Sequence, residues 1–99
     1  MSKKRTSNKR SSEPKELEPL LKALANRRRL ALLRHIKHNP DISVSVLAKS
    51  IRLSIKATSK HLGILSRAKI VEHKQRSLRI FYRLASPLPN GVREIITLL

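Results

Sequence analysis

The sequence predicts a mainly α-helical fold that carries a small β-hairpin and ends in one further helix. Three observations lead to this prediction. Apolar residues recur at helical spacing between residues 17 and 65, the spacing changes to strict alternation between residues 70 and 84, and a last helical stripe follows two prolines. The order α-α-α-α-β-β-α over residues 13–99 is that of one domain.

The first two helices are predicted from leucine spacing. Their first stripe, at i, i+3, i+4 and i+7, comprises Leu17, Leu20, Leu21 and Leu24. Pro19 lies within this stripe, and because proline is tolerated in a first helical turn, we expect the helix to start near Glu18. Asn26 is expected to cap a second helix that runs to about His38. The arginines of that helix should stay in water or reach phosphate: Arg27, Arg28, Arg29 and Arg34.

Two further helices are each preceded by a serine that can cap them. Ser43 is expected to cap a helix from Val44 to about Ile51, and Ser54 a helix over residues 54–68. In the second of these, the inward face carries Thr58, His61, Leu62 and Leu65. The opposite face carries Lys56, Ser59, Lys60 and Gly63. Cations, hydroxyls and a small residue on one exposed face suit reading of base edges in a major groove.

The alternating segment, residues 70–84, predicts two strands joined through Arg76 and Ser77. The tip of this hairpin would present Arg76 and Arg79 to sugar-phosphate or to a minor groove, unless it is simply a solvated turn. Two short helices followed by such a hairpin have the layout of a winged helix-turn-helix, with the hairpin as the wing.

A last helix is expected after Pro87 and Pro89, with Asn90 as its cap. Its apolar stripe comprises Val92, Ile95, Ile96 and Leu99. This face must fold back on the core or meet a partner. Together with the leucine stripe of the first helix it is the best surface for a homodimer.

The formal net charge of +17 makes double-stranded DNA the expected partner. Residues 1–12 contain five basic residues and no acid, and we expect a disordered basic arm that either aids solubility or adds a DNA contact. No apolar run approaches the length of a membrane span and no secretory segment follows Met1, so no membrane partner is expected. We expect the protein in the cytoplasm, associated with the nucleoid, or in the host cytoplasm if its source is a virus.

Few residues suggest catalysis or metal binding. The chain has no cysteine, its six acids are scattered, and its two glycines form no phosphate-binding loop, so neither an enzyme nor a cofactor is expected. His35 and His38 lie three residues apart without a third ligand, and no metal is expected. His61 should pack with a hydrogen bond, whereas His73 has no evident partner.

The order of elements and three strings resemble the arsenic-repressor (ArsR-type) family of winged helix-turn-helix regulators. The strings are Leu21-Lys22-Ala23-Leu24-Ala25-Asn26 before Arg29-Leu30, then Ser59-Lys60-His61-Leu62 with Leu65, and Phe81-Tyr82-Arg83-Leu84. The likeness covers about residues 17–99. It implies a dimer formed through the first and last helices, with the fourth helix in the major groove and the wing beside it.

The sequence also departs from that family. Ser43-Val44-Ser45 stands where many members have a Cys-Val-Cys metal site, and the last helix has no histidine and only the acid Glu94, which argues against metal sensing. Lys69 and Ser77-Leu78 stand where the family usually has glycine. A left-handed backbone there would cost a non-glycine residue about 1 kcal/mol.

Two functions therefore compete. The first is a sequence-specific, dimeric transcription regulator, expected to be a repressor. Its predicted DNA-binding residues are Arg52, Ser54, Lys56, Ser59, Lys60, Arg76 and Arg79. The second is a nonspecific architectural protein that coats DNA through charge. RNA binding is disfavoured, because Phe81 and Tyr82 are the only aromatic residues available for stacking.

Overall fold

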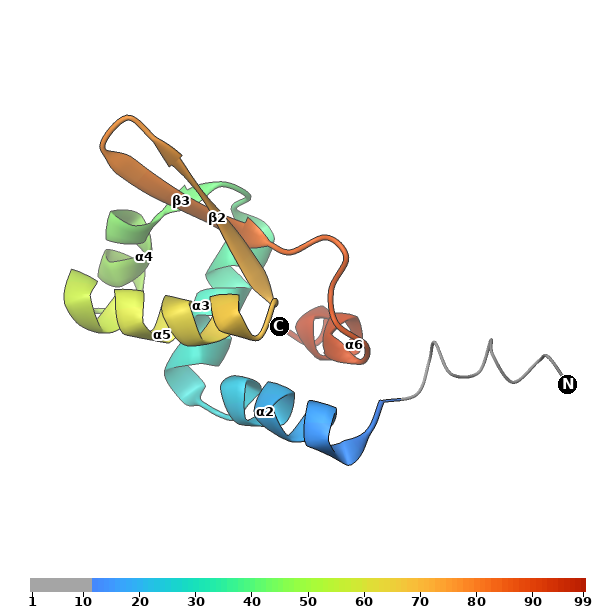
Figure 1. Ribbon diagram of the computed structural model, residues 1–99. Coiled ribbons are helices and arrows are strands. Elements are labelled where there is room, and N and C mark those ends of the chain that lie inside the picture. Colours follow the sequence, from blue (N-terminus) through green and yellow to red (C-terminus); the bar gives the residue numbers. More distant parts are fainter. Residues whose placement is uncertain (1–11) are drawn as a thin grey trace, which may run out of the picture.

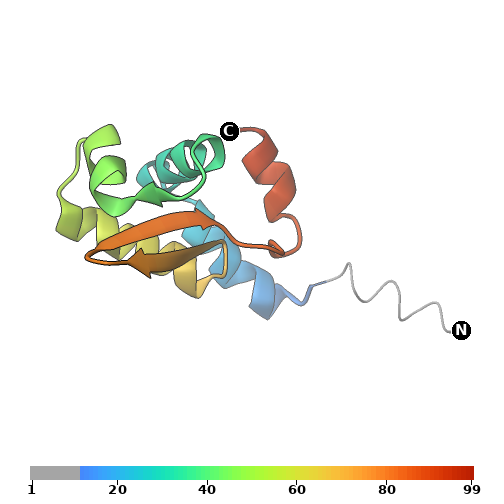
Figure 2. The same cartoon turned by 90° about the horizontal axis from the view of Figure 1, so that it is seen from above.

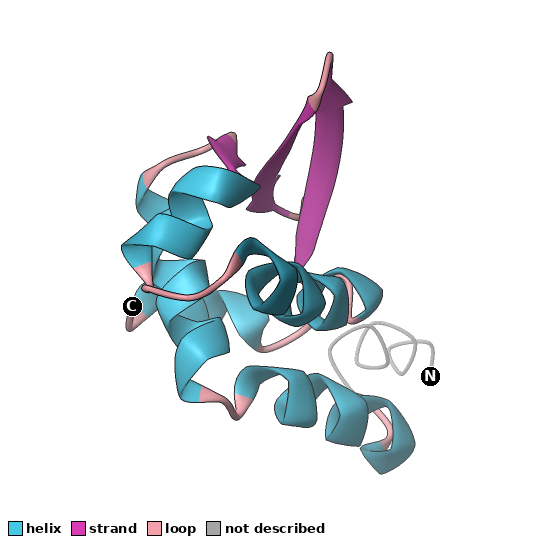
Figure 3. Cartoon of the chain, turned by 90° about the vertical axis from the view of Figure 1, so that its left-hand side faces the viewer, coloured by secondary structure: helices cyan, strands magenta, loops and turns pink. Residues whose placement is uncertain are grey.

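The computed structural model describes residues 12–99 as a group of helices from which a β-hairpin projects (Figures 1 and 3). The elements are α2 (Pro14–Leu24), α3 (Arg27–His38), β1 (Ile42–Ser43), α4 (Val44–Ser50), α5 (Ile55–Arg67), β2 (Val71–Arg76), β3 (Arg79–Leu84) and α6 (Val92–Thr97). The predicted order is confirmed, with β1 as an addition. The predicted basic arm lies, except for Ser12, outside the described residues.

Helix α3 is central to the core, because it contacts α2, α4, α5, α6 and β3. The largest fully buried apolar side chains come from α3, α4, α5 and α6 and from Ile70, which lies between α5 and β2: Leu32, Leu33, Ile36, Leu47, Leu62, Leu65, Ile70 and Val92. Helix α5 therefore sits on a continuous apolar base, which fixes the direction of its outer face.

Three of the four predicted N-caps are confirmed. In each, the side-chain oxygen accepts a hydrogen bond from the backbone N–H three residues further along the chain, as capping requires. The pairs are Asn26 with Arg29 (3.0 Å), Ser43 with Val46 (3.3 Å) and Ser54 with Ala57 (3.0 Å).

Helix α2 begins earlier than the sequence predicted. It starts at Pro14 rather than near Glu18, because Glu13 and Glu16 form a reciprocal capping box, with Glu13 N–H donating to Glu16 Oε1 at 3.2 Å. Proline is favoured at the first position of a helix, so Pro14 also supports this start. Pro19 consequently lies inside the helix, on an exposed side where water can bond the carbonyl left without its helical partner.

Helix α6 also starts differently. Its N-cap is Gly91, with φ of 84°, and not Asn90 as predicted. The left-handed backbone at this position favours glycine, which has no Cβ to clash. This shift places Val92 at the first helical position, where its side chain is fully buried.

The wing consists of the antiparallel pair β2 and β3, with Val71 opposite Leu84 and Arg76 opposite Arg79. The predicted hairpin is confirmed. Strand β1, which the sequence did not predict, pairs with the other side of β3 through Ile42 and Tyr82. This third strand attaches the base of the wing to the segment just before α4.

Two turns have left-handed backbones at residues where the family usually has glycine. The φ angles are 62° at Lys69, after α5, and 59° at Ser77, in the wing turn. We expect Lys69→Gly and Ser77→Gly each to raise the free energy of unfolding by about 0.5–1 kcal/mol, because the relief of strain exceeds the entropy that glycine adds to the unfolded chain. Urea denaturation followed by circular dichroism measures this effect.

Gly91 provides the matched control for these variants. A Cβ built on Gly91 meets no atom within 4 Å, so Gly91→Ala tests the backbone alone. We expect it to lower stability by about 1 kcal/mol. Loss of stability in all three variants would contradict the account of the two turns.

Candidate nucleic-acid interface

Helices α4 and α5 form a helix-turn-helix with a tight connection. The Leu53 N–H donates to Ala48 O at 3.0 Å, and Arg52 takes a left-handed backbone with φ of 55°. Helix α5 is held against the core by Thr58, Leu62 and Leu65, all fully buried. Its outer face is therefore free to meet a ligand.

The structure places the predicted DNA-binding side chains on the surface. All seven are exposed: Arg52, Ser54, Lys56, Ser59, Lys60, Arg76 and Arg79. In both Figure 1 and Figure 2, the tip of the wing lies at the same end of the molecule as α4 and the N-terminal end of α5. Two basic elements far apart in sequence thus occupy one end of the protein.

Arg76 in the wing is oriented by two neighbours. Its Nη2 lies 3.4 Å from Asp41 Oδ2, and its guanidinium carbon lies 5.0 Å from the centroid of the Phe81 ring. The Arg76 side chain nevertheless remains 52% exposed, so these contacts limit its freedom without removing it from solvent. Fixing an arginine in this way lowers the entropy that the side chain would lose on binding an anion.

Arg29 does not stay in water, contrary to the sequence prediction. Its Nε donates to Ala23 O at 2.6 Å, its Nη2 to Lys22 O at 3.0 Å and its Nη1 to His61 Nδ1 at 3.2 Å. Arg29 therefore satisfies carbonyls in the last turn of α2 and links that helix to α5. The expected hydrogen bond of His61 is confirmed.

His61 is held in its neutral form by its surroundings. Burial, followed by the positive charges of Arg29 and Arg28, lowers the pKa of His61 from its ordinary value of 6.5. The folded protein consequently binds fewer protons than the unfolded chain just below pH 6.5. The stability contributed by neutral His61 is fully present above that pH and is lost as the pH falls.

We expect His61→Gln to make stability less sensitive to acid. Glutamine keeps a hydrogen-bond acceptor for Arg29 but does not titrate. Urea unfolding of both proteins at pH 7.5 and 5.5 should give a smaller decrease for the variant. An equal decrease in both proteins would show that His61 does not cause the acid sensitivity.

His73 has a partner that the sequence did not reveal. Its ring lies 5.5 Å from that of Tyr82 across the β2–β3 pair, because the register places these two residues opposite each other. Within residues 12–99, no three His, Cys, Asp or Glu side chains gather where they could hold a metal ion. In the same part of the chain, no helix has the length and apolar character needed to cross a bilayer.

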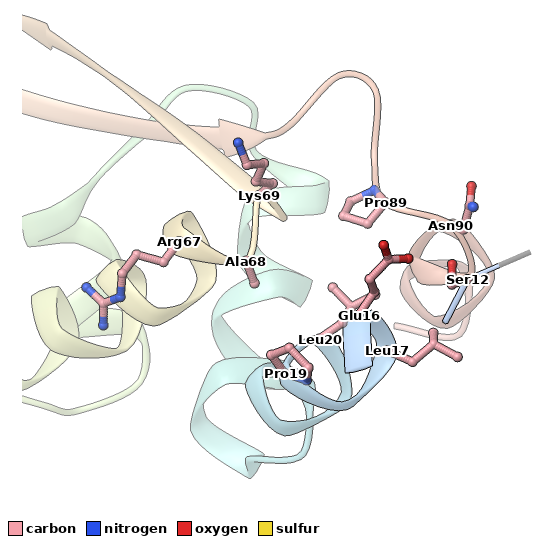
Figure 4. A pocket seen from close by; sticks show the side chains of 10 residues that line it. All are labelled: Ser12, Glu16, Leu17, Pro19, Leu20, Arg67, Ala68, Lys69, Pro89 and Asn90. Atoms are coloured by element: carbon pink, nitrogen blue, oxygen red, sulfur yellow. The ribbon is translucent and has the colours of Figure 1, made fainter. Parts of the chain in front are cut away.

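A groove of about 600 Å³ lies between α2, the end of α5 and the segment before α6 (Figure 4). Leu17, Pro19 and Leu20 contribute apolar side chains from α2, and Pro89 lies across from them. The groove is on the side of the predicted dimer surface rather than at the end that carries the wing tip.

An exposed cationic helix in a helix-turn-helix, next to a basic wing, defines a winged helix-turn-helix DNA-binding protein. Comparison with known proteins agrees. A family model described as winged helix-turn-helix DNA-binding matches residues 26–72. The transcriptional activator HlyU of Vibrio cholerae serotype O1 is 39% identical over 77 residues, which cover 78% of this chain and 70% of that protein.

Solved structures are similar as well. Reduced HlyU from Vibrio cholerae has 36% identity and a TM-score of 0.73, over 85% of this chain and 84% of that one. A homodimeric winged helix-turn-helix domain from Mycobacterium bovis, described as a possible ArsR-family regulator, has 26% identity and a TM-score of 0.72, over 89% of this chain and 82% of that one. The chain belongs to the ArsR-type family of winged helix-turn-helix transcription regulators. It is a sequence-specific DNA-binding regulator and not an enzyme.

Proposed function

We propose that the protein binds DNA as a homodimer, with α5 of each protomer in the major groove and the wing on the adjacent backbone. In this arrangement Lys56, Ser59 and Lys60 read base edges. The side chains that hold sugar-phosphate are Arg52, Ser54, Arg76 and Arg79. The observation that carries the proposal is the exposure of all seven side chains, with the wing tip and the start of α5 at one end of the fold.

Gly63 supports the placement of α5. A Cβ added there would have only Arg67 Nη1 nearby, at 3.6 Å, which is an ordinary contact. Nothing among the described residues therefore requires glycine, although glycine inside a helix costs about 1 kcal/mol relative to alanine. A close approach of this part of the helix to DNA accounts for its presence.

The dimer surface is proposed on α2 and α6. Of the eight predicted residues, Leu24, Val92 and Ile96 lie in the core of the protomer and have little surface left for a partner. The remaining five keep exposed or half-exposed surface: Leu17, Leu20, Leu21, Ile95 and Leu99. The homodimeric Mycobacterium bovis domain supports a homodimer, and a two-fold dimer would require an inverted repeat with half-sites about one helical turn apart.

Leu21→Lys tests the assembly. Leu21 is 52% exposed, so we expect the variant to fold but to dissociate, because burial of a charge opposite its symmetry mate is costly. Sedimentation velocity should show a dimer for the unchanged protein and a monomer for the variant. Leu78→Lys, on a wing residue that is 95% exposed, is the control and should stay dimeric. A dimeric Leu21→Lys protein would contradict the proposed surface.

We propose repression by occlusion as the mode of regulation. In this mode, protein bound at a promoter excludes competitors from the same DNA. HlyU of Vibrio cholerae is described as a transcriptional activator. Occlusion also raises transcription at a promoter where the excluded competitor is a repressor. A reporter whose promoter overlaps the selected operator should lose expression when the protein is present. Raised expression from that reporter would contradict the proposal.

We place this activity in the cytoplasm, on the nucleoid, with no cofactor and no metal.

The architectural alternative is favoured by one observation, the net charge of +17. The two modes differ in how affinity depends on salt. For binding through charge alone, the logarithm of the binding constant should fall linearly with the logarithm of the salt concentration. The slope should be about 0.9 for each phosphate neutralised and the same for all sequences. A regulator should instead keep a preference for its operator across the salt series.

A further inference from the structure

Ile55 is an apolar residue in a place where the fold does not need one. It is the first residue of α5 and is 54% exposed. Among the described residues, it belongs neither to the hydrophobic core nor to the partly buried side chains that pack against the core. Its neighbours Ser54 and Lys56 are exposed and polar.

The position of Ile55 relates it to the proposed reading face. The exposed residues in the first half of α5 are Ile55, Lys56, Ser59 and Lys60. Ile55 and Ser59 are four residues apart and therefore lie one above the other on the helix. The N-terminal residues of a recognition helix are those that contact base edges.

The chemistry of an isoleucine restricts what it can contact there. It can neither donate nor accept a hydrogen bond, and the apolar group that base pairs present in the major groove is the C5-methyl of thymine. Burial of the two apolar surfaces against each other would favour thymine over cytosine or uracil at one position of each half-site.

We propose that Ile55 is a specificity-determining residue that contacts a thymine methyl group in each half-site. This inference rests on the proposed placement of α5 in the major groove. Lys56, Ser59 and Lys60 supply hydrogen bonds on the same face, and Ile55 adds the one apolar contact.

The test combines protein and DNA variants. On the operator obtained by selection, each thymine is replaced in turn by uracil, which removes only the methyl group. We expect one symmetric position at which this change weakens binding of the unchanged protein by about fourfold per half-site, the value of one buried methyl group. For Ile55→Ala the same change should have no effect, and Ile55→Val should keep most of it.

Val46→Ala is the matched control, because Val46 is a half-exposed apolar residue on α4, 49% exposed. It should retain the full effect of uracil. If the unchanged protein and Ile55→Ala give the same uracil profile at every position, the inference is overturned. Lys60→Ala separates this result from failure of the proposed function. If Lys60→Ala weakens binding to the operator more than binding to random DNA, the placement of α5 in the major groove stands and only the role of Ile55 is wrong. If Lys60→Ala and Ile55→Ala each weaken binding to all sequences equally, the placement of α5 in the major groove is wrong as well.

Discussion

Leu62→Ala is expected to lower the free energy of unfolding by about 3 kcal/mol. Leu62 lies in the middle of α5 and is fully buried in the core cluster, so truncation removes its apolar contacts and leaves a cavity. The total stability of a domain of this size is about 5–15 kcal/mol. The loss would therefore remove a substantial share of the stability and lower the urea concentration of the unfolding midpoint, which urea denaturation followed by circular dichroism measures.

Leu98→Ala is the matched control, because the same side chain is truncated at a position that is 82% exposed. We expect a change within about 0.5 kcal/mol. A loss below 1 kcal/mol for Leu62→Ala would mean that α5 is not anchored through this residue. The outer face of α5 would then lack the fixed direction that the reading of DNA requires.

Lys60→Ala is expected to weaken operator binding by about 1–3 kcal/mol while changing affinity for random DNA little. Lys60 is exposed on the outer face of α5, where its ammonium can donate to guanine N7 and O6. Fluorescence anisotropy with operator and scrambled duplexes of equal length, at one salt concentration, gives both affinities.

Arg79→Ala supplies the comparison for a backbone contact. Arg79 is exposed at the start of β3, next to the wing turn, and its loss should weaken binding to both duplexes alike. An equal loss on both duplexes for Lys60→Ala as well would remove Lys60 from the base-reading residues.

Much of this fold could be predicted because its signals are local. The caps Asn26, Ser43 and Ser54 each bond to an N–H three residues away, and the alternation over residues 70–84 depends only on neighbouring residues. The left-handed turns at Lys69 and Ser77 were anticipated as possible costs from the absence of glycine, and the structure shows both.

The features that the sequence did not predict depend on contacts across the fold or on competing local signals. Strand β1 has two residues, too few to show a period, and exists because β3 pairs with it. In the sequence, Arg29 cannot be told from the arginines beside it. Its side chain turns away from water only because the last turn of α2 lies next to it and offers two carbonyl acceptors. Helix α2 starts at Pro14 because the capping box of Glu13 fixes its N-terminus there, whereas Pro19 had indicated a start near Glu18.

The surface position of the polar residues of the candidate site could be predicted from the sequence, whereas that of Ile55 could not. Two lysines and a serine on one helical face are visible in the sequence, whereas an apolar residue at the start of a helix is ordinarily assigned to the core. Only its exposure, together with its spacing of four from Ser59, distinguishes Ile55 from the buried residues of α5.

Selection of bound duplexes from a random library at about 150 mM salt tests the central claim most directly, because purely ionic binding is weakened under these conditions. The account predicts enrichment of an inverted repeat whose half-sites lie about one helical turn apart, as two α5 helices related by a two-fold axis require. Retention of DNA without any enriched sequence would contradict it and would show that charge alone holds the protein on DNA.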